Sequence, residues 1–250
     1  MKNLWRLTLV GVAAFVLFVV VTAPAAKLLP WLQPQLPGVR LGGVSGSLWS
    51  GRAQVLQAAG IPFSDVRWHL RPLTLFKGAL EVAVEAQFNR QPLRAHAGLG
   101  LFAGAYVADI SGSMTASDLL FLSGMRVAEL DGLVDFDIDR VTGIGSGLPA
   151  MAGSVTWSPA RVLAPLELDL GKAQLQTRIE DGATRGQLVA GGGVLGVKGD
   201  VRLNPDGSYQ LVGDVTRQGA VPQAVDRFLD TFAEPSNGGF RLQWSDQIKF

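Results

Sequence analysis

The sequence predicts a mainly β protein, in which a single N-terminal transmembrane helix is followed by a curved, extended antiparallel β-sheet with one or two short helices. An uncharged apolar run near the N-terminus is just long enough to span a bilayer. From about residue 38 onward, apolar and polar residues alternate with a period of two, which is typical of antiparallel strands with one face in water. The 31 glycines are spread along the chain without a fixed repeat, as expected for many strands joined by tight turns.

Composition excludes several classes of function. The formal net charge of the 250-residue chain is +1, and no Lys/Arg cluster follows the N-terminal segment, so nucleic acid is not an expected partner. The chain contains no cysteine, which excludes disulfides, Cys-ligated zinc and thiol catalysis. Charged residues make up 17% of the chain and hydrophobic residues 48%, and part of that apolar excess lies in the N-terminal run.

The N-terminal segment, residues 1–26, is predicted to be a membrane anchor. Lys2 and Arg6 precede the apolar run Leu7–Ala23, and this basic flank predicts a cytoplasmic N-terminus with the rest of the chain across the membrane. Ala23–Ala25 resembles a signal-peptidase site, so cleavage is the alternative. The length of the run favours an uncleaved anchor.

Residues 27–37 form a proline-rich, amphipathic connector to the domain predicted over residues 38–250. The connector could lie at the outer membrane interface with Trp31 at headgroup level. Alternatively, its apolar residues close the near end of the domain, because Pro30 and Pro34 interrupt any long helix. The domain itself is predicted to be an antiparallel β domain.

The glycine-rich stretch Gly43–Ala53 is predicted to be the first strand of the sheet, kinked at Gly46 and Gly51. A phosphate-binding glycine loop is the functional alternative. That loop requires a helix directly after it, and Val55–Pro62 is too short and too soon interrupted to provide one.

Alternation of apolar and polar residues predicts the later strands, which are Val66–Arg71, Val82–Phe88, Val134–Asp139, Leu166–Leu170, Val201–Leu203 and Gly239–Trp244. The turn Asn204–Gly207 joins Val201–Leu203 to Tyr209–Leu211 in a predicted hairpin.

Two short helices are predicted between these strands. One covers Thr115–Leu122, with Thr115 or Ser117 as its N-cap. The other covers Pro222–Phe232 and begins with proline in its first turn. Its predicted apolar face consists of Val225, Phe228, Leu229 and Phe232.

Two helices cannot cover the whole apolar face of such a sheet. The sheet must therefore curl, pack as a sandwich, or leave a groove for a lipid or a partner. Glycines within several strands favour curling, and these are Gly46, Gly51, Gly132, Gly153 and Gly199.

No catalytic, cofactor-binding or metal-binding residue is predicted, and the protein is not expected to be an enzyme. His69 and His96 are the two histidines, and both fall in polar positions of strands without a familiar catalytic motif around them. Asp135, Asp137 and Asp139 share one strand face. Their side chains diverge along a straight strand, so they are expected to form a solvated acidic face rather than a calcium site.

Three patches resemble the type II secretion system protein N family. They are Gly-Ser-Leu-Trp-Ser-Gly-Arg-Ala at Gly46–Ala53, Trp-His-Leu-Arg-Pro at Trp68–Pro72, and the closing strand Gly239–Ser245. The resemblance implies one inner-membrane anchor and a periplasmic part that serves as a non-enzymatic accessory component of type II protein secretion. Other secretion-system proteins are its implied partners.

A second resemblance rests on layout. The single anchor, the strand series and the one-sided alternation are similar to the AsmA-like lipid-handling proteins. That resemblance implies an alternative function, carriage of a lipid or hydrophobic ligand on the apolar face of a curved sheet, with phospholipid as the partner.

Overall fold

The computed structural model describes residues 24–27, 38–58, 60–71, 74, 78–100, 104–122, 128–144, 147–236 and 238–247. The predicted anchor Leu7–Ala23 lies outside these residues, as does the connector 27–37 except for Lys27. Among the described residues, no helix combines the length and the apolar character needed to cross a membrane.

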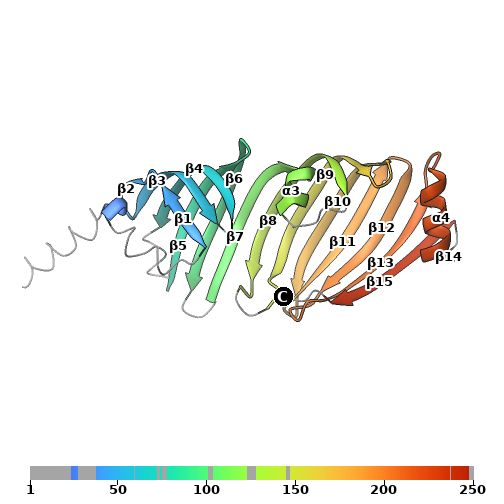
Figure 1. Cartoon of the computed structure of the whole chain (residues 1–250). Helices are drawn as coiled ribbons and strands as arrows, with labels where there is room; N and C mark the ends of the chain where they lie inside the picture. Colours follow the sequence, from blue (N-terminus) through green and yellow to red (C-terminus); the bar gives the residue numbers. More distant parts are fainter. Residues whose placement is uncertain are drawn as a thin grey trace, which may run out of the picture. The chain divides into compact units, whose positions relative to one another are not determined.

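The chain divides into two compact units, Met1–Arg90 and Gln91–Phe250. Figure 1 labels their elements. Unit 1 contains β1 (Val39–Gly42), β2 (Ser45–Gly46), β3 (Ser50–Ala58), β4 (Ile61–Arg71) and β5 (Ala79–Phe88). Unit 2 contains β6 (Gln91–Gly100), β7 (Gly104–Thr115), α3 (Ala116–Leu122), β8 (Glu129–Thr142), β9 (Ala150–Ala164), β10 (Leu168–Glu180), β11 (Ala183–Gly192), β12 (Leu195–Leu203), β13 (Ser208–Arg217), α4 (Gln223–Phe232), β14 (Glu234–Ser236) and β15 (Gly239–Gln247).

The strands confirm a mainly β, antiparallel architecture. In unit 1 the order is β1-β3-β4-β5, with β2 also paired to β3. In unit 2 the strands β6 to β13 follow chain order, and β15 and then β14 complete the sheet. The predicted hairpin is present, because Leu203 pairs with Tyr209 across the turn. The predicted strand at Leu166 begins later, at Leu168.

The prediction of one kinked strand over Gly43–Ala53 is wrong. The chain forms β2, turns over residues 47–49, and returns as β3, so that Gly46 pairs with Gly51. The turn is closed by Ser47, whose backbone N–H donates to the carbonyl oxygen of Ser50 (2.8 Å) and whose Oγ accepts the Ser50 N–H (3.1 Å). These local hydrogen bonds offer the backbone an alternative to a continuous strand.

The Trp68 side chain joins this hairpin to β4. Its indole Nε1 donates to the carbonyl oxygen of Leu48 (3.1 Å), and the Leu70 N–H donates to the carbonyl oxygen of Trp49 (2.7 Å). A Cβ on Gly51 would lie 2.3 Å from the Trp68 ring, so the ring packs on bare backbone. Two of the patches that carried the family resemblance are therefore in direct contact.

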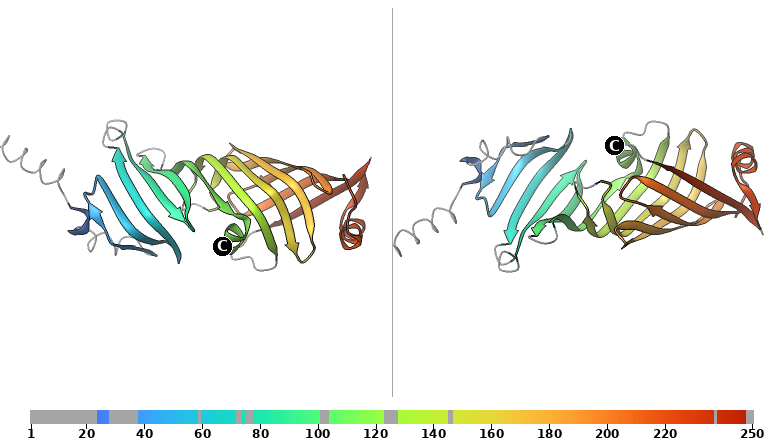
Figure 2. Two further views of the ribbon diagram at one scale, coloured as in Figure 1. Left: turned by 90° about the horizontal axis from the view of Figure 1, so that it is seen from above. Right: turned by 90° about the horizontal axis from the view of Figure 1, so that it is seen from below.

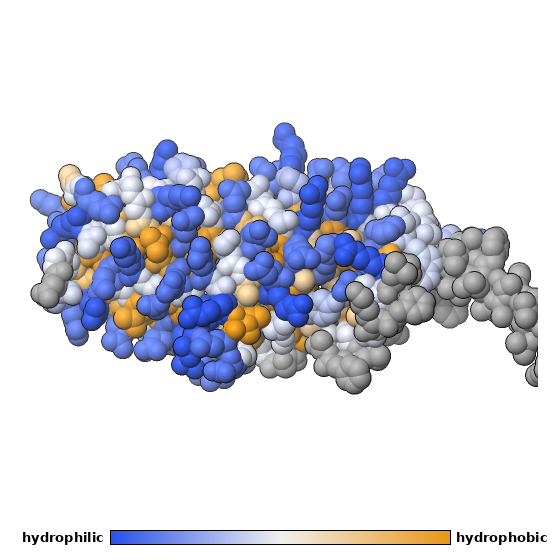
Figure 3. All heavy atoms as spheres, turned by 180° about the vertical axis from the view of Figure 1, so that it is seen from behind, coloured by the Kyte–Doolittle hydropathy of each residue, from blue (hydrophilic) through white to orange (hydrophobic). Residues whose placement is uncertain are grey.

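The sheet of unit 2 has one apolar side, which we name the inner face. Two rows of cross-strand partners define it, Phe136–Val155–Leu175–Leu188–Gly199–Gly213–Leu242 and Val134–Trp157–Ala173–Ala190–Val197–Val215–Phe240. The outer face is largely polar, as in the row Asp135–Thr156–Gln174–Val189–Lys198–Asp214–Arg241. Figure 3, which views the molecule from behind, shows hydrophilic side chains predominating over smaller apolar patches.

The unit 2 sheet is curled, as predicted. Figure 2 shows β13 and β15 running obliquely to β8 and β9. The turn between β8 and β9 reaches the turn between β12 and β13, where the Leu148 N–H donates to the carbonyl oxygen of Pro205 (2.9 Å). Register shifts on β8 add local twist, one of them at Gly132, whose φ is +109°.

Both predicted helices are confirmed. α3 follows Thr115, whose Oγ1 accepts the Asp118 N–H (3.1 Å) as an N-cap. α4 follows Pro222 and ends where the Ala233 N–H donates to the carbonyl oxygen of Leu229. Phe228, which the helical spacing places on the apolar face of α4, is 46% exposed.

Candidate functional site: an apolar groove on the inner face

A groove of about 400 Å³ lies on the inner face of unit 2, within the range of volumes that hold small ligands. Its lining consists of apolar side chains from α3 and from four neighbouring strands: Ala116, Leu119, Leu120, Leu130, Val134, Val155, Trp157, Ala173, Leu175 and Leu188. Four adjacent strands span about 15 Å across the sheet at the usual strand spacing. The groove can therefore accept an elongated apolar group laid across the strands.

The helix α3 forms one wall of the groove. Ala116 is buried, and Leu119 and Leu120 face the same groove as Val134 of β8. Leu119 nevertheless remains 44% exposed. A leucine left in this position offers apolar surface that a ligand can cover.

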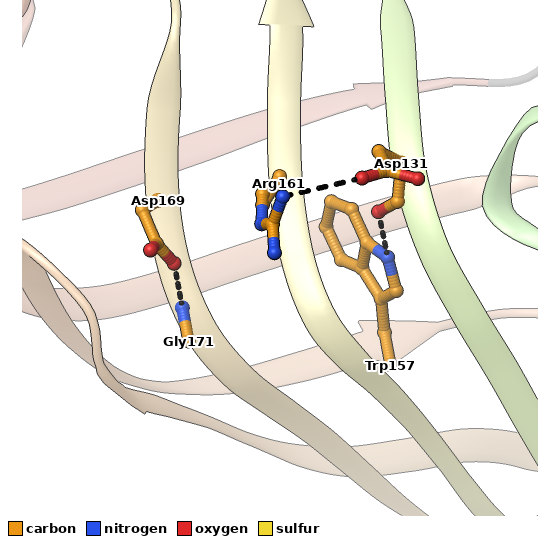
Figure 4. Close-up of polar contacts among 5 residues, drawn as sticks. All are labelled: Asp131, Trp157, Arg161, Asp169 and Gly171. Atoms are coloured by element: carbon orange, nitrogen blue, oxygen red, sulfur yellow. Dashed lines mark hydrogen bonds and ion pairs between the residues drawn. The ribbon is translucent and has the colours of Figure 1, made fainter.

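Trp157 is fixed in the groove by polar contacts at one end of the strands (Figure 4). Its indole Nε1 donates to the carbonyl oxygen of Asp131 (2.9 Å), and Arg161 lies 3.6 Å from the Asp131 carboxylate. A Cβ on Gly132 would lie 1.9 Å from the carbonyl oxygen of Pro159, so only glycine permits this approach of the two strands. The Trp157 ring is thus held as a rigid apolar wall with its polar atom satisfied.

The helix α4 covers a different part of the inner face. Leu195, Val215, Val225, Leu229 and Phe240 form a cluster of buried side chains between α4 and strands β12, β13 and β15. Arg217 contributes at the edge of this cluster, with an ion pair to Asp226 of α4 (3.0 Å) and a guanidinium 4.8 Å from the centre of the Phe240 ring. The inner face is thus sealed beneath α4 and open between α3 and β11.

The described residues that line the groove are all uncharged and apolar, so this lining can bind an apolar chain. The nearest charges described above, on Asp131 and Arg161, are half-exposed and pair with each other. Such a site recognises shape and apolar character rather than a particular head group.

The histidines and aspartates considered in the sequence do not come together. His69 is exposed on β4, whereas Nδ1 of His96 lies 2.8 Å from Oδ2 of Asp109, in an ion-pair geometry on β6 and β7. Asp135, Asp137 and Asp139 are all exposed, as predicted. Within the described ranges, no group of three or more His, Cys, Asp or Glu residues could hold a metal ion.

The sequence interpretation did not single out the residues of β10 and β11 that line the groove. Ala173, Leu175 and Thr177 alternate with Gln174 and Gln176, which is the same period-two signal used for the other strands. This signal could have placed β10 on the apolar face. It could not have shown which part of that face a helix covers.

Comparison with known proteins identifies the family. A family model described as Type II secretion system (T2SS), protein N matches residues 37–243. The chain is 25% identical over 253 residues to type II secretion system protein N of Aeromonas hydrophila, a match that covers 99% of this chain and 100% of the relative. It is 26% identical over 235 residues to the protein of that name from Pectobacterium carotovorum subsp. carotovorum, covering 92% of this chain and 91% of the relative. A third relative of that name, from Vibrio cholerae, is 25% identical over 229 residues, with 88% and 89% of the two chains covered.

No solved structure matches the chain significantly. The family match extends over both units, from just before β1 to within β15. The chain therefore belongs to the type II secretion system protein N family.

Proposed function

We propose that this protein is a non-enzymatic accessory component of type II protein secretion. In this proposal Leu7–Ala23 holds it in the inner membrane as a single-pass protein, residues from Lys27 onward are periplasmic, and other secretion-system proteins are its partners. The observation that carries the proposal is the family match over residues 37–243. The basic flank and apolar run of the N-terminus support the membrane part.

Deletion of the gene tests this role. Proteins that the bacterium exports by type II secretion should then accumulate in the periplasm, and expression of the full chain should return them to the medium. Normal amounts in the medium after deletion would contradict the proposal.

A second function is favoured by the groove. We propose that it holds an apolar ligand, with the acyl chain of a phospholipid as the candidate. The support is that the described lining residues are all apolar and include a partly exposed leucine on α3. Burial of an acyl chain against such a surface is favourable by about 0.8 kcal/mol per methylene group.

Mass spectrometry of gently purified full chain should find bound phospholipid under this proposal. The substitution Leu175→Arg places a charge in the groove and should reduce the bound lipid by about tenfold. Gln176→Arg, on the outer face of the same strand, is the matched control and should leave it unchanged. Equal amounts of lipid in both variants would exclude the groove as the binding site.

A further inference from the structure

The last long strand, β15, has one edge that is only partly covered. Strand β14 pairs with Gly239–Arg241, and β13 pairs with the opposite edge of β15 as far as Gln247. Among the described residues, no strand pairs with Leu242–Gln247 on the side of β15 that β14 occupies. We name this segment the open edge.

The covered and open parts of this edge differ in chemistry. β14 is three residues long and contains Pro235 opposite Phe240, and proline has no N–H for a further ladder. The first part of the edge is therefore protected against strand addition. The open edge has no proline, and at every second residue it presents backbone N–H and C=O groups that no described strand pairs; of these, the Gln247 N–H donates to Oδ1 of the neighbouring Asp246 (2.8 Å).

The side chains beside the open edge define what could pair with it. Leu242 and Trp244 lie on the inner face, where Trp244 is opposite Leu211 of β13 and remains 53% exposed. Asp246 follows on the same face, opposite Tyr209, and is exposed. An added strand would thus meet two apolar side chains and then a carboxylate.

A second copy of this chain fits the open edge poorly. Cross-strand partners share one face, so the two longest two-fold antiparallel pairings that β14 leaves room for are centred on Trp244 and on Ser245. The first sets the Asp246 carboxylate of each copy opposite Leu242 of the other and the second sets it opposite Trp244, in either case an unfavourable pair repeated twice. A short extended segment avoids this mismatch, because its own residues can be apolar and basic at the matching positions.

We propose that the open edge binds an extended segment of a partner polypeptide by antiparallel strand addition, with apolar side chains opposite Leu242 and Trp244 and a basic side chain opposite Asp246. Backbone hydrogen bonds would supply affinity, and the alternate side chains would supply specificity. This inference rests on the proposed function in one respect, since a secretion-system protein would supply the segment.

A designed peptide tests the proposal on the purified full chain. The probe is a fluorescein-labelled peptide, Thr-Lys-Thr-Val-Thr-Val, whose lysine falls opposite Asp246 and whose valines fall opposite Trp244 and Leu242. Binding is read by fluorescence anisotropy. Methylation of the peptide amides that face β15 should weaken peptide binding at least about tenfold, because these amides make the hydrogen bonds between the two strands. Methylation of the alternate amides, which point away from β15, should change the binding affinity less than about twofold. No binding of the unmodified peptide, or equal effects of both methylation patterns, would overturn the proposal.

Protein variants locate the peptide at the open edge. Trp244→Ala should weaken binding about tenfold, and the outer-face control Gln243→Ala should leave it within about twofold. Asp246→Lys should weaken binding of the lysine peptide and improve binding of a version with glutamate in its place. If Asp246→Lys leaves the affinity for both peptides unchanged, the peptide is not bound in the proposed register.

Binding and secretion are measured separately, so the two proposals can fail independently. If the peptide binds and deletion leaves secretion normal, the open edge is confirmed and the secretion role is wrong. If deletion blocks secretion and the peptide does not bind, the secretion role holds and the open edge is wrong.

Discussion

The cluster beneath α4 gives the sharpest stability prediction. Leu229 is 3% exposed and contacts the buried side chains of β12, β13 and β15. Leu229→Ala removes most of a buried side chain and leaves a cavity, which costs about 2–5 kcal/mol in well-packed cores. Because the cluster has five buried members among the described residues and one helix as cover, we expect the middle of that range, about 3 kcal/mol.

Thermal unfolding followed by circular dichroism measures this effect in detergent solution. A loss of about 3 kcal/mol should lower Tm by roughly 6–12 °C for a chain of this size. Leu119→Ala on α3 is the control, because Leu119 is 44% exposed and its truncation should cost less than about 1 kcal/mol. Equal Tm values for wild type and Leu229→Ala would show that α4 does not pack on the sheet. The division of the inner face into sealed and open parts would then be wrong.

Three further predictions concern a backbone contact, a carboxylate and the N-terminus. Gly132→Ala should destabilise the protein by about 2 kcal/mol or more in denaturant unfolding, because the added Cβ would lie 1.9 Å from a backbone oxygen at a residue whose φ is +109°. The control Gly42→Ala, which has open space around it, should be nearly neutral, and similar losses of unfolding free energy in both variants would contradict the close approach at Gly132. The hydrogen bond from the Ser208 side chain is the main cause that lowers the pKa of Asp206, so its contribution to the stability of the folded protein is present above the ordinary aspartate pKa and is lost as the pH falls through the lowered value. Ser208→Ala should therefore raise the pKa of Asp206 in a carboxyl NMR titration, and an unchanged titration would refute this cause. N-terminal sequencing of membrane-extracted protein should show that Leu7–Ala23 is retained, whereas a mature N-terminus at Ala26 would show that the segment is cleaved and is not an anchor.

The period-two signal predicted the sheet well because it reports which side chains face the core. Val134 and Ile138 are buried while Asp135 and Asp137 are exposed, as the alternation requires. The hairpin at Asn204–Gly207 was equally readable, because the preference of its residues for turns is local.

Features that depend on distant contacts could not be predicted in this way. The turn at Ser47 is closed by local hydrogen bonds, but it is held in place by Trp68, which arrives from another strand. Phe228 has the helical spacing of a core residue and is nevertheless 46% exposed, whereas Val225 and Leu229 of the same helix are buried in the cluster. The groove likewise arises from where α3 and α4 settle on the inner face, and no local pattern encodes that choice.

The absence of cysteine from the chain allows a direct test of the groove by single-cysteine labelling. Leu175→Cys places a thiol in the groove, and Val215→Cys places one beneath α4, where the native residue is 3% exposed. With a small maleimide, the groove thiol should react at least about tenfold faster than the sealed one in the folded protein, and both should react alike in denaturant. Equally slow labelling of both thiols in the folded protein would show that the groove is closed, and equally fast labelling would show that α4 does not seal the inner face.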